Sequence, residues 1–359
     1  MRIFQLVPSL GYGDAVGNDA LAVRDVIRRM GIGTEIFYAE KMDRRFPEGT
    51  ARPLSDMPAL HGKDILIYHG CTGAPVNYTL PEYGGKKVLI YHNVTPPAFF
   101  RGVNPDIERI QQDALDGFRF LADKIDYCVA VSEFNRRDLA AMGYRCPIDV
   151  CPVVISYGDY DAEPDRGTME RMRADGRRNL LFVGRISPNK KQEDVIRAFA
   201  CYRRRYDRES RLTLIGSAGG TENYLESLKA YARKLGLEDS VVFPGHIRFD
   251  EILAYYRTAD VFVCMSEHEG FCVPLIEAMY FGVPIAAYGA AAVPDTLGGG
   301  GLLLDSKDPG LAAAAIRRIV TDGALRRRIR REQEKVLRRF SQEETEKTMT
   351  GCIRRAISL

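Results

Sequence analysis

The sequence lacks several patterns that would assign it to a common functional class. Its eight cysteines include no C-x-x-C pair, which disfavours a zinc site or a disulfide framework and favours buried, reduced thiols in a cytoplasmic protein. The net charge of +3 over 359 residues is too small to indicate a nucleic-acid binder. No G-x-G-x-x-G stands between an expected strand and helix, so a nicotinamide dehydrogenase is disfavoured.

Long apolar runs are also missing. The chain opens directly on an expected strand, RIFQLV, without a charged segment and apolar run before it, so we expect no signal peptide. The uncharged stretch from Ala278 to Pro294 is interrupted by glycines and prolines, and we expect no membrane-spanning helix. These absences predict a cytoplasmic protein that has at most a peripheral contact with the inner face of the cell membrane.

Short apolar runs alternate with longer amphipathic ones. Those in the first half are RIFQLV, TEIFYA, DILIYH, KVLIYH, YCVAVS and DVCPVV, and each is typical of a buried strand. Between the first two, Ala20, Val23 and Ile27 fall on one helical face, and Asn18 or Asp19 can cap this helix. Such alternation predicts an α/β protein with parallel sheets wound on both faces.

The alternation stops at a charged stretch, Ser156 to Arg178, which we interpret as a linker followed by a helix. It restarts with NLLFVG, RLTLIG, SVVFPG, ADVFVCM, PIAAYG and GLLLD. The length of the chain also favours two domains. We therefore predict two Rossmann-like, doubly wound domains facing across a cleft, over residues 1–160 and 161–340. Residues 341–359 are expected to form a helix that crosses back to the first domain.

A basic turn opens the second half, in LLFVGRISPNKKQEDVIRAFA. A strand ending at Gly184 is followed by Arg185 and, after a turn, by Lys190 and Lys191 before the next helix. Cations beside a helix N-terminus suit a pyrophosphate, because the helix adds free N–H groups and a partial positive charge. On charge alone, a solvated basic turn is the alternative interpretation.

Two glutamates flank the loop in EHEGFCVPLIEAM. Glu269 lies on the loop, and Glu277 is expected in the first helical turn, where it would stay ionised. A carboxylate can accept hydrogen bonds from a ribose diol or from sugar hydroxyls. The amides of residues 271–273, beside the flexible Gly270, can approach a phosphate or a sugar. The alternative interpretation is two surface glutamates, one of which complements the helix dipole. Together with the basic turn, the spacing of the two glutamates is a strong signal for a ligand site.

These two motifs carry a family resemblance. EHEGFCVPLIEAM resembles the E-x7-E motif of the retaining glycosyltransferases of family 4, which have the GT-B fold, and VGRISPNK resembles their donor-phosphate turn. The resemblance covers the whole second half, including the stretch AAVPDTLGGGGLLLD and the terminal RRFSQEE. The first half is similar more loosely, through GDAVGNDALAVRDVIRRMG and AVSEFNRRDL. The segment IYHNVTPPAFF is similar to a branch of bacterial enzymes that build surface polysaccharides.

The resemblance implies roles for the matching residues, with the first domain on the acceptor side and the second on the donor side. Arg185 and Lys190 would bind the donor diphosphate, and Lys191, at the family's usual glycine, could share or take over that contact. Glu277 would hold the ribose, and Glu269 would contact the donor sugar. The catalytic set implied is His92, Glu269, Arg185 and Lys190. The other donor-binding residues implied are Gly13, Asp14, Lys191, His246, Gly270, Phe271, Cys272, Val273 and Glu277.

His92 follows a strand of the first half and matches the family's cleft histidine, which meets the sugar near the reacting carbon. His69 ends the neighbouring strand and is either an acceptor contact or, as a lone histidine more often is, structural. Asn93 and Ser132 are weaker acceptor candidates.

Two departures from the family pattern bear on the site. Cys272 stands where the family usually has glycine, so we expect the backbone there to avoid positive φ. Asp14 puts a carboxylate where a second glycine is common, near the expected phosphates or facing the acceptor.

The implied activity is transfer of a hexosyl group from a nucleotide diphosphate sugar to a sugar or lipid-linked glycan acceptor, with retention. GDP-mannose is the first guess for the donor. No metal or cofactor is expected, because cations and helix N-termini can stabilise the leaving diphosphate and no His/Asp/Glu cluster has metal-ligand spacing. A nucleotide-sugar 2-epimerase and a catalytically silent nucleotide-sugar-binding subunit are the alternatives. We interpret the basic segment Leu325–Arg339 as a solvated helix face, with contact to anionic lipid as the alternative.

Overall fold

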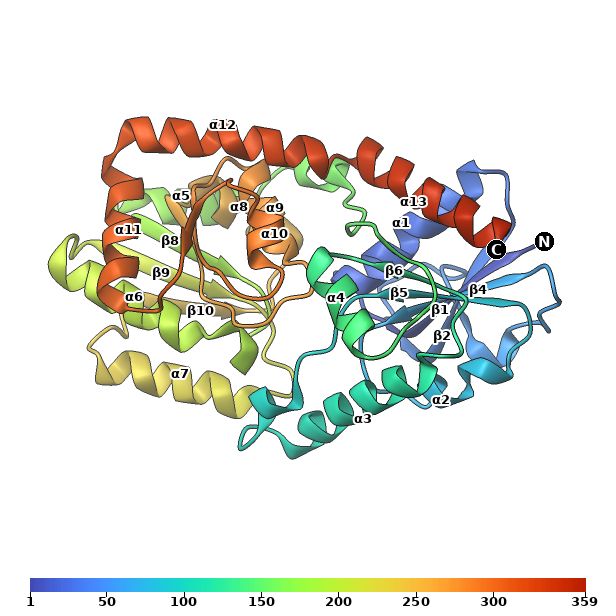
Figure 1. The fold of residues 1–359 in the computed structure, drawn as a ribbon. Helices are drawn as coiled ribbons and strands as arrows, with labels where there is room; N and C mark the ends of the chain where they lie inside the picture. The colour runs from blue at the N-terminus through green and yellow to red at the C-terminus, as the bar shows by residue number, and fades with distance from the viewer. The chain divides into compact units, whose positions relative to one another are not determined.

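The chain folds into two compact units (Figure 1). The computed structural model describes all of residues 1–359. Unit 1 comprises Met1–Ala98, Asp106–Ser156 and Arg339–Leu359, and unit 2 comprises Phe99–Pro105 and Tyr157–Arg338. The predicted fold class is confirmed, since each unit is built on one parallel sheet with connecting helices.

Unit 1 contains a seven-stranded parallel sheet in the order β3-β2-β1-β4-β5-β6-β7. The strands are β1 Ile3–Leu10, β2 Thr34–Met42, β3 Arg52–Pro53, β4 Ile65–Gly70, β5 Lys86–Tyr91, β6 Tyr127–Ala130 and β7 Ile148–Val150. The strand expected over DVCPVV ends early, at Val150, and Pro152 follows without an N–H to donate to a ladder. The two-residue edge strand β3 was not predicted from the sequence.

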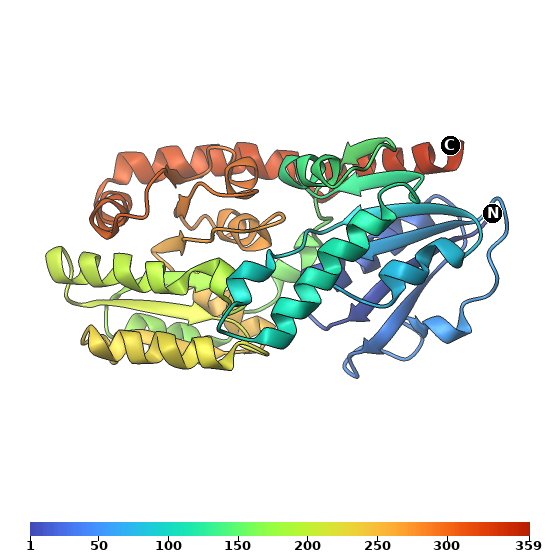
Figure 2. The same ribbon diagram turned by 60° about the horizontal axis from the view of Figure 1, so that its bottom comes forward.

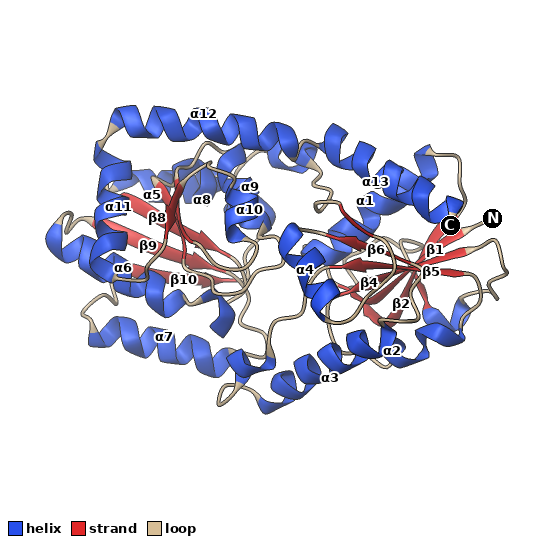
Figure 3. Cartoon of the chain, in the orientation of Figure 1, coloured by secondary structure: helices blue, strands red, loops and turns tan.

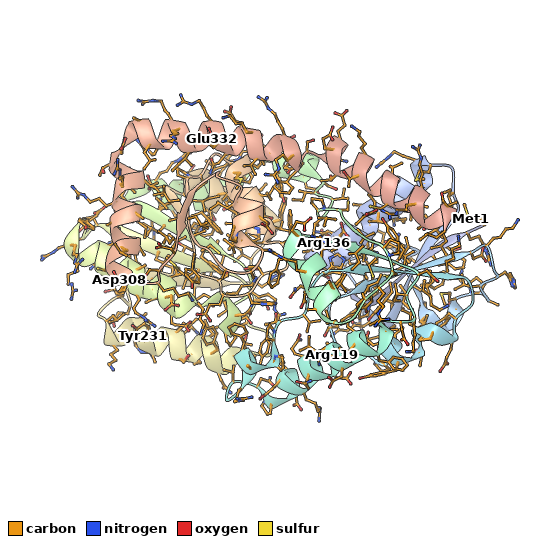
Figure 4. The ribbon with its side chains drawn as sticks, viewed as in Figure 1. Met1, Arg119, Arg136, Tyr231, Asp308 and Glu332 are labelled. Atoms are coloured by element: carbon orange, nitrogen blue, oxygen red, sulfur yellow. The ribbon has the colours of Figure 1, made fainter.

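The helices that connect these strands are α1 Ala15–Arg29, α2 Val76–Thr79, α3 Pro105–Leu121 and α4 Glu133–Ala141, with short 3₁₀ helices η1 Leu54–Asp56 and η2 Leu80–Glu82. Unit 1 also contains α13 Gln342–Ser358, and the 3₁₀ helix η3 Pro97–Phe100 includes the boundary between Ala98 of unit 1 and Phe99 of unit 2. Helix α13 lies beside α1 (Figure 1), and an ion pair of 2.7 Å joins Arg29 to Glu346. Exposed arginines cover the outer faces of α3 and α4, where Figure 4 labels Arg119 and Arg136.

The cap expected at Asn18 or Asp19 is wrong. Helix α1 begins four residues before Asp19, and Asp14 is its N-cap. The Asp14 carboxylate accepts hydrogen bonds from the N–H groups of Val16 at 2.8 Å and Gly17 at 2.9 Å. Asp19 instead lies inside the helix on its buried face.

Unit 2 contains a six-stranded parallel sheet in the order β10-β9-β8-β11-β12-β13. The strands are β8 Arg178–Val183, β9 Ser210–Ile215, β10 Val241–Gly245, β11 Val261–Cys264, β12 Ile285–Tyr288 and β13 Leu302–Leu304. All six coincide with the apolar runs of the second half. Figure 3 shows them as a set of red strands with blue helices around them.

Helices cover both faces of this sheet, as Figure 2 shows. They are η4 Tyr157–Asp161, α5 Arg166–Ala174, η5 Pro188–Lys190, α6 Gln192–Arg205, α7 Glu222–Lys234, α8 Phe249–Thr258, α9 Val273–Tyr280, α10 Val293–Leu297, α11 Pro309–Thr321 and α12 Gly323–Arg339. Helix α6 packs with α7 and α11, while α5 packs with α8. None of the helices in the chain combines the length and the apolar character needed to cross a membrane.

The strand order reverses once in each sheet, between β1 and β4 in unit 1 and between β8 and β11 in unit 2. Open α/β sheets bind ligands outside the carboxyl ends of their strands at such a reversal. The residues that follow these four strands are therefore the first place to look for function in each unit.

Candidate functional site

The basic turn of unit 2 follows β8, at the strand-order reversal. Gly184 and Arg185 leave the sheet close to β9, where a Cβ placed on Gly216 would lie 1.9 Å from the Gly184 carbonyl oxygen. Gln192 donates a hydrogen bond of 2.8 Å to the backbone carbonyl of Arg185. The Arg185 side chain is exposed and forms no ion pair within the chain. Its guanidinium is therefore available to an anionic ligand.

Lys190 joins this turn to the loop after β11. Its ammonium lies 2.5 Å from Glu269 Oε2, and the two side chains are only 19% and 8% exposed. Burial lowers the pKa of Lys190, and the neighbouring Glu269 more than offsets this, so the pKa is raised overall. The pair unites residues that are far apart in the sequence because β8 and β11 are adjacent strands.

Lys191 has different partners. Its ammonium lies 3.5 Å from Glu267 and 3.6 Å from Glu193, and it stands 5.8 Å from the centre of the Phe99 ring. Its backbone is left-handed, with φ of 53°, which is the conformation that a glycine would adopt easily. The two neighbouring lysines thus pair with different carboxylates, and only Lys190 reaches Glu269.

Phe99 was not predicted as a site residue. Besides Lys191, its ring contacts the imidazole of His268, with 6.3 Å between ring centres. The segment Phe99–Pro105 belongs to unit 2, and Asn104 donates a hydrogen bond of 2.8 Å to the Gly220 carbonyl there. The aromatic pair at the end of IYHNVTPPAFF was the available signal, but Phe99 is half-buried and Phe100 is buried, so the pair alone could not separate a site contact from core packing.

The loop from Gly270 to Val273 corrects one expectation. Cys272 has φ of 77°, so the backbone takes the positive φ that we expected it to avoid. This residue precedes α9, and the sharp entry into the helix requires the left-handed conformation although cysteine adopts it at a cost. Neighbouring contacts hold the loop, including a hydrogen bond of 2.5 Å from Thr296 Oγ1 to the Phe271 carbonyl.

Glu277 also differs from the expectation. It is the fifth residue of α9 and therefore lies in the second turn, not the first. Tyr256 donates a hydrogen bond of 2.7 Å to Glu277 Oε2, and Tyr160 donates one of 3.2 Å to Oε1. Burial raises the pKa of Glu277, and the two tyrosine hydroxyls lower it in part. The carboxylate is held by tyrosines rather than by the helix N-terminus that we expected to keep it ionised.

In unit 1, the loop after β1 contains Gly13 and Asp14. Gly13 is exposed and has φ of 77°, which explains the need for glycine there. The Asp14 carboxylate caps α1 and also accepts a hydrogen bond of 3.0 Å from the Gly11 N–H. Its hydrogen bonds are therefore local, to the backbone of the loop and helix.

His92 and His69 meet at the ends of β5 and β4. His69 Nδ1 lies 3.1 Å from His92 Nε2, and His69 Nε2 lies 2.8 Å from Gln5 Oε1. Asp19 Oδ2 is 3.6 Å from His92 Nε2. Spacing in the sequence predicted no cluster of possible metal ligands, but the fold brings Asp19, His69 and His92 together, and likewise Cys264, Glu269 and Cys272.

Of the remaining candidates, Ser132 and Asn93 share Asn135 as a neighbour in unit 1, whereas His246 lies in unit 2. Ser132 caps α4 through its hydroxyl, which accepts the Asn135 N–H at 3.1 Å. Asn93 donates a hydrogen bond of 2.8 Å to Asn135 Oδ1 and has φ of 84°. His246 is exposed after the edge strand β10. Contacts of these three residues with an acceptor or a nucleobase stay predictions.

The site in unit 2 coincides with a match to known proteins. Residues 170–336, which are most of unit 2, match the family described as glycosyl transferases group 1. This part of the chain is therefore similar to the group 1 glycosyltransferases. The basic turn, Glu269 and Glu277 all lie within the matched residues.

Curated relatives are similar over a comparable stretch. The chain is 30% identical over 217 residues to D-inositol 3-phosphate glycosyltransferase of Corynebacterium jeikeium, a match that covers 57% of the chain and 52% of the relative. It is 28% identical over 216 residues to GDP-mannose-dependent alpha-(1-6)-phosphatidylinositol monomannoside mannosyltransferase of Mycobacterium tuberculosis, covering 57% and 55%. The match thus spans about half the length of these relatives.

Solved structures share the fold of the chain over its full length. Sucrose-phosphate synthase of Thermosynechococcus elongatus matches with a TM-score of 0.74, 18% identity and 100% coverage of both chains. Anabaena HepE in complex with UDP-glucose matches with the same TM-score, identity and coverage. At this identity the likeness shows the fold, which is GT-B.

Proposed function

We propose that this chain is a glycosyltransferase that transfers a hexosyl group from a nucleotide diphosphate sugar to a sugar or lipid-linked glycan acceptor, with retention of configuration. The observation that carries the proposal is the cluster at the strand-order reversal of unit 2. There the exposed Arg185 and the Lys190–Glu269 ion pair follow two adjacent strands, and Glu277 follows in α9. This is where open α/β sheets bind nucleotides.

The leaving group of such a reaction is a nucleoside diphosphate, whose developing charge needs stabilisation. Arg185 offers a bidentate fork and Lys190 a point charge. The first turn of α9 contains no acidic residue, so its free N–H groups and partial positive charge also favour an anion. These groups supply the electrostatic stabilisation that the reaction requires.

Retention fits a front-side reaction. The bond between the anomeric carbon and the donor phosphate breaks as the acceptor oxygen bonds to the same face, and the departing phosphate oxygen takes the acceptor proton. His92 would contact the transferred sugar, as its match to the family's histidine implies. GDP-mannose is the donor to test first, because it appears in the names of two similar mycobacterial enzymes.

A thermal-shift panel tests the donor site. GDP-, UDP- and ADP-sugars and the free nucleotides are added, with and without a chelator, to the wild type and to Arg185→Ala. A ligand that binds the folded state raises the melting temperature with its concentration. Arg204→Ala, which removes another exposed arginine of unit 2, is the matched control. We expect one nucleotide family to stabilise the wild type and the control in chelator, but not Arg185→Ala.

Transfer itself is then measured as release of the nucleoside diphosphate with candidate sugar and lipid-linked acceptors. A shift that survives Arg185→Ala, or that requires a metal, would contradict the assignment of the donor site. Binding without turnover on any acceptor or on water would favour a catalytically silent subunit instead.

A further inference from the structure

Asp19 is a buried carboxyl group for which the proposed reaction has no use. It lies on α1 with 1% of its surface exposed. Its Oδ1 accepts the Val154 N–H at 2.9 Å, whereas Oδ2 is buried and makes no hydrogen bond. An unpartnered buried carboxyl oxygen is costly and needs an explanation.

The unpartnered oxygen is directed at two histidines. Asp19 Oδ2 lies 3.6 Å from His92 Nε2 and 4.0 Å from His69 Nδ1, and these two ring nitrogens are 3.1 Å apart. Gln5 Oε1, 2.8 Å from His69 Nε2, completes the set. The four side chains come from α1, β1, β4 and the residue after β5, so the fold of unit 1 brings them together.

Hydrogen-bond chemistry assigns the protons in this cluster. An amide oxygen only accepts, so His69 Nε2 carries a hydrogen and donates it to Gln5. His69 Nδ1 then has the lone pair and accepts the Nε2–H of His92. The same N–H faces Asp19 Oδ2, and an ionised carboxylate favours a proton at that nitrogen. The other nitrogen of His92, Nδ1, is left as an acceptor.

A proton can be assigned to one ring nitrogen of His69 and of His92 only if both imidazoles are neutral. Burial lowers the pKa of His92 to about 3 and also lowers that of His69, so each ring has one proton near neutral pH. Burial raises the pKa of Asp19 to about 7. Above that pH the carboxylate is ionised, and its negative charge favours a proton on His92 Nε2, which lies 3.6 Å from Asp19 Oδ2.

We propose that Asp19 and His69 are positioning residues that hold His92 with Nε2 protonated, so that Nδ1 accepts a hydrogen bond from a hydroxyl of the transferred sugar. This inference rests on the proposed function, because it gives His92 a contact with the sugar. Asp19 acts only through His92 and is not expected to touch the substrate.

Asp19→Asn is the informative variant because it keeps the shape but places an N–H₂ donor where the carboxylate accepts. A donor at this position favours a lone pair on His92 Nε2 and hence a proton on Nδ1. In a serine-protease triad the equivalent change selects the wrong tautomer and slows kcat by roughly 10⁴-fold. In this protein the change would remove one hydrogen bond, from a sugar hydroxyl to His92 Nδ1. We therefore expect kcat to fall at least about tenfold, with the donor KM within about twofold of the wild-type value.

The tautomer is read directly by NMR of protein labelled with ¹⁵N-histidine, in donor-free protein at pH 8. The chain has five histidines, so single His→Gln variants assign the signals. We expect a proton on Nε2 of His92 in the wild type and on Nδ1 in Asp19→Asn. Asp25→Asn, on the same helix but with its side chain 48% exposed, is the control and should leave the tautomer and kcat unchanged.

A second pair of variants keeps the test decisive if Asp19→Asn folds poorly. In His69→Asn the amide oxygen can replace Nδ1 as the acceptor for His92, whereas His69→Leu removes the acceptor. We expect His69→Asn to retain most of kcat and His69→Leu to lose it at equal melting temperature. Equal activity of the two would overturn a positioning role for His69.

Other outcomes also separate the two proposals. A proton on Nδ1 of His92 in the wild type, or full kcat in Asp19→Asn, overturns the inference while leaving the transferase proposal intact. One equivalent of zinc bound by the purified wild type and lost in Asp19→Asn would also overturn it, since the cluster would then be a metal site. If the wild type transfers no sugar, the proposed function fails, and the inference about the sugar contact fails with it, whatever the tautomer.

Discussion

The ion pair between Lys190 and Glu269 should be one of the strongest single interactions in unit 2. Its charges are 2.5 Å apart, and the side chains are 19% and 8% exposed. At the effective dielectric of a protein surface, charges this close attract by on the order of 5 kcal/mol. Removing one partner leaves the other charge largely buried, which costs about 3–5 kcal/mol. We therefore expect both Lys190→Met and Glu269→Gln to lower the free energy of unfolding by several kcal/mol.

A double-mutant cycle isolates the interaction. The double variant leaves no unpaired charge, so it should be less destabilised than the sum of the single variants, with a coupling of about 2–4 kcal/mol. The matched control is Lys229–Glu226, a pair in α7 at 2.8 Å with side chains 38% and 64% exposed, for which we expect less than about 0.5 kcal/mol. Urea unfolding followed by circular dichroism measures both cycles, using the transition that the variants shift, because the two units need not unfold together. Additive effects at Lys190 and Glu269, within about 0.5 kcal/mol, would refute the reasoning.

Three other expectations follow from the geometry of single residues. Cys272→Val should lower the free energy of unfolding by at least about 2 kcal/mol, because a β-branched residue is strained at positive φ. In the same urea experiment the control Cys201→Val, at a buried position of helix α6, should cost far less. Equal costs for the two variants would contradict the argument. Asp14→Ala should lower stability by about 1–2 kcal/mol through loss of the α1 cap, and loss of ligand binding at unchanged melting temperature would instead show that this carboxylate serves the ligand. Burial raises the pKa of Asp19 to about 7 in the folded protein. As pH rises from about 4 to 7, the free energy of unfolding of the wild type should therefore fall relative to that of Asp19→Asn, on the order of a few kcal/mol. Parallel curves of unfolding free energy against pH for the two proteins would contradict this.

The strands and the two-unit organisation could be predicted because they rest on local patterns. Every apolar run of the second half forms a strand. A strand of a parallel sheet is buried on both of its faces, so it appears in the sequence as a run of consecutive apolar residues. The E-x7-E loop and the basic turn were found in the same way. Their union through Lys190 and Glu269 depended on the order of strands in the sheet, which the resemblance to a known fold supplied and local periodicity did not.

The errors that matter most for the site concern contacts between distant parts of the chain or a backbone conformation that the surrounding fold imposes. The left-handed Cys272 was missed because steric preference disfavours positive φ, whereas the turn into α9 imposes it. The partners of Glu277, Tyr160 and Tyr256, are 117 and 21 residues away in the sequence. Asp19 looked like a possible helix cap because a polar residue near a helix start usually is one. Its burial follows from the packing of α1 against β1 and β2, which also brings it near His69 and His92.

The two buried clusters at the strand-order reversals solve the same electrostatic problem differently. In unit 2 the carboxylate of Glu269 faces the ammonium of Lys190. Lys190 stays charged although it is buried, because its pKa is raised overall, so it balances the charge of Glu269. In unit 1 the carboxyl of Asp19 faces two neutral imidazoles, and burial raises its pKa to about 7. An anionic ligand that competes for Lys190 therefore changes the charge balance of the cluster in unit 2. The charge of the cluster in unit 1 changes when Asp19 gains or loses its proton. A pH change near neutrality should act on unit 1, and an anionic ligand should act on unit 2.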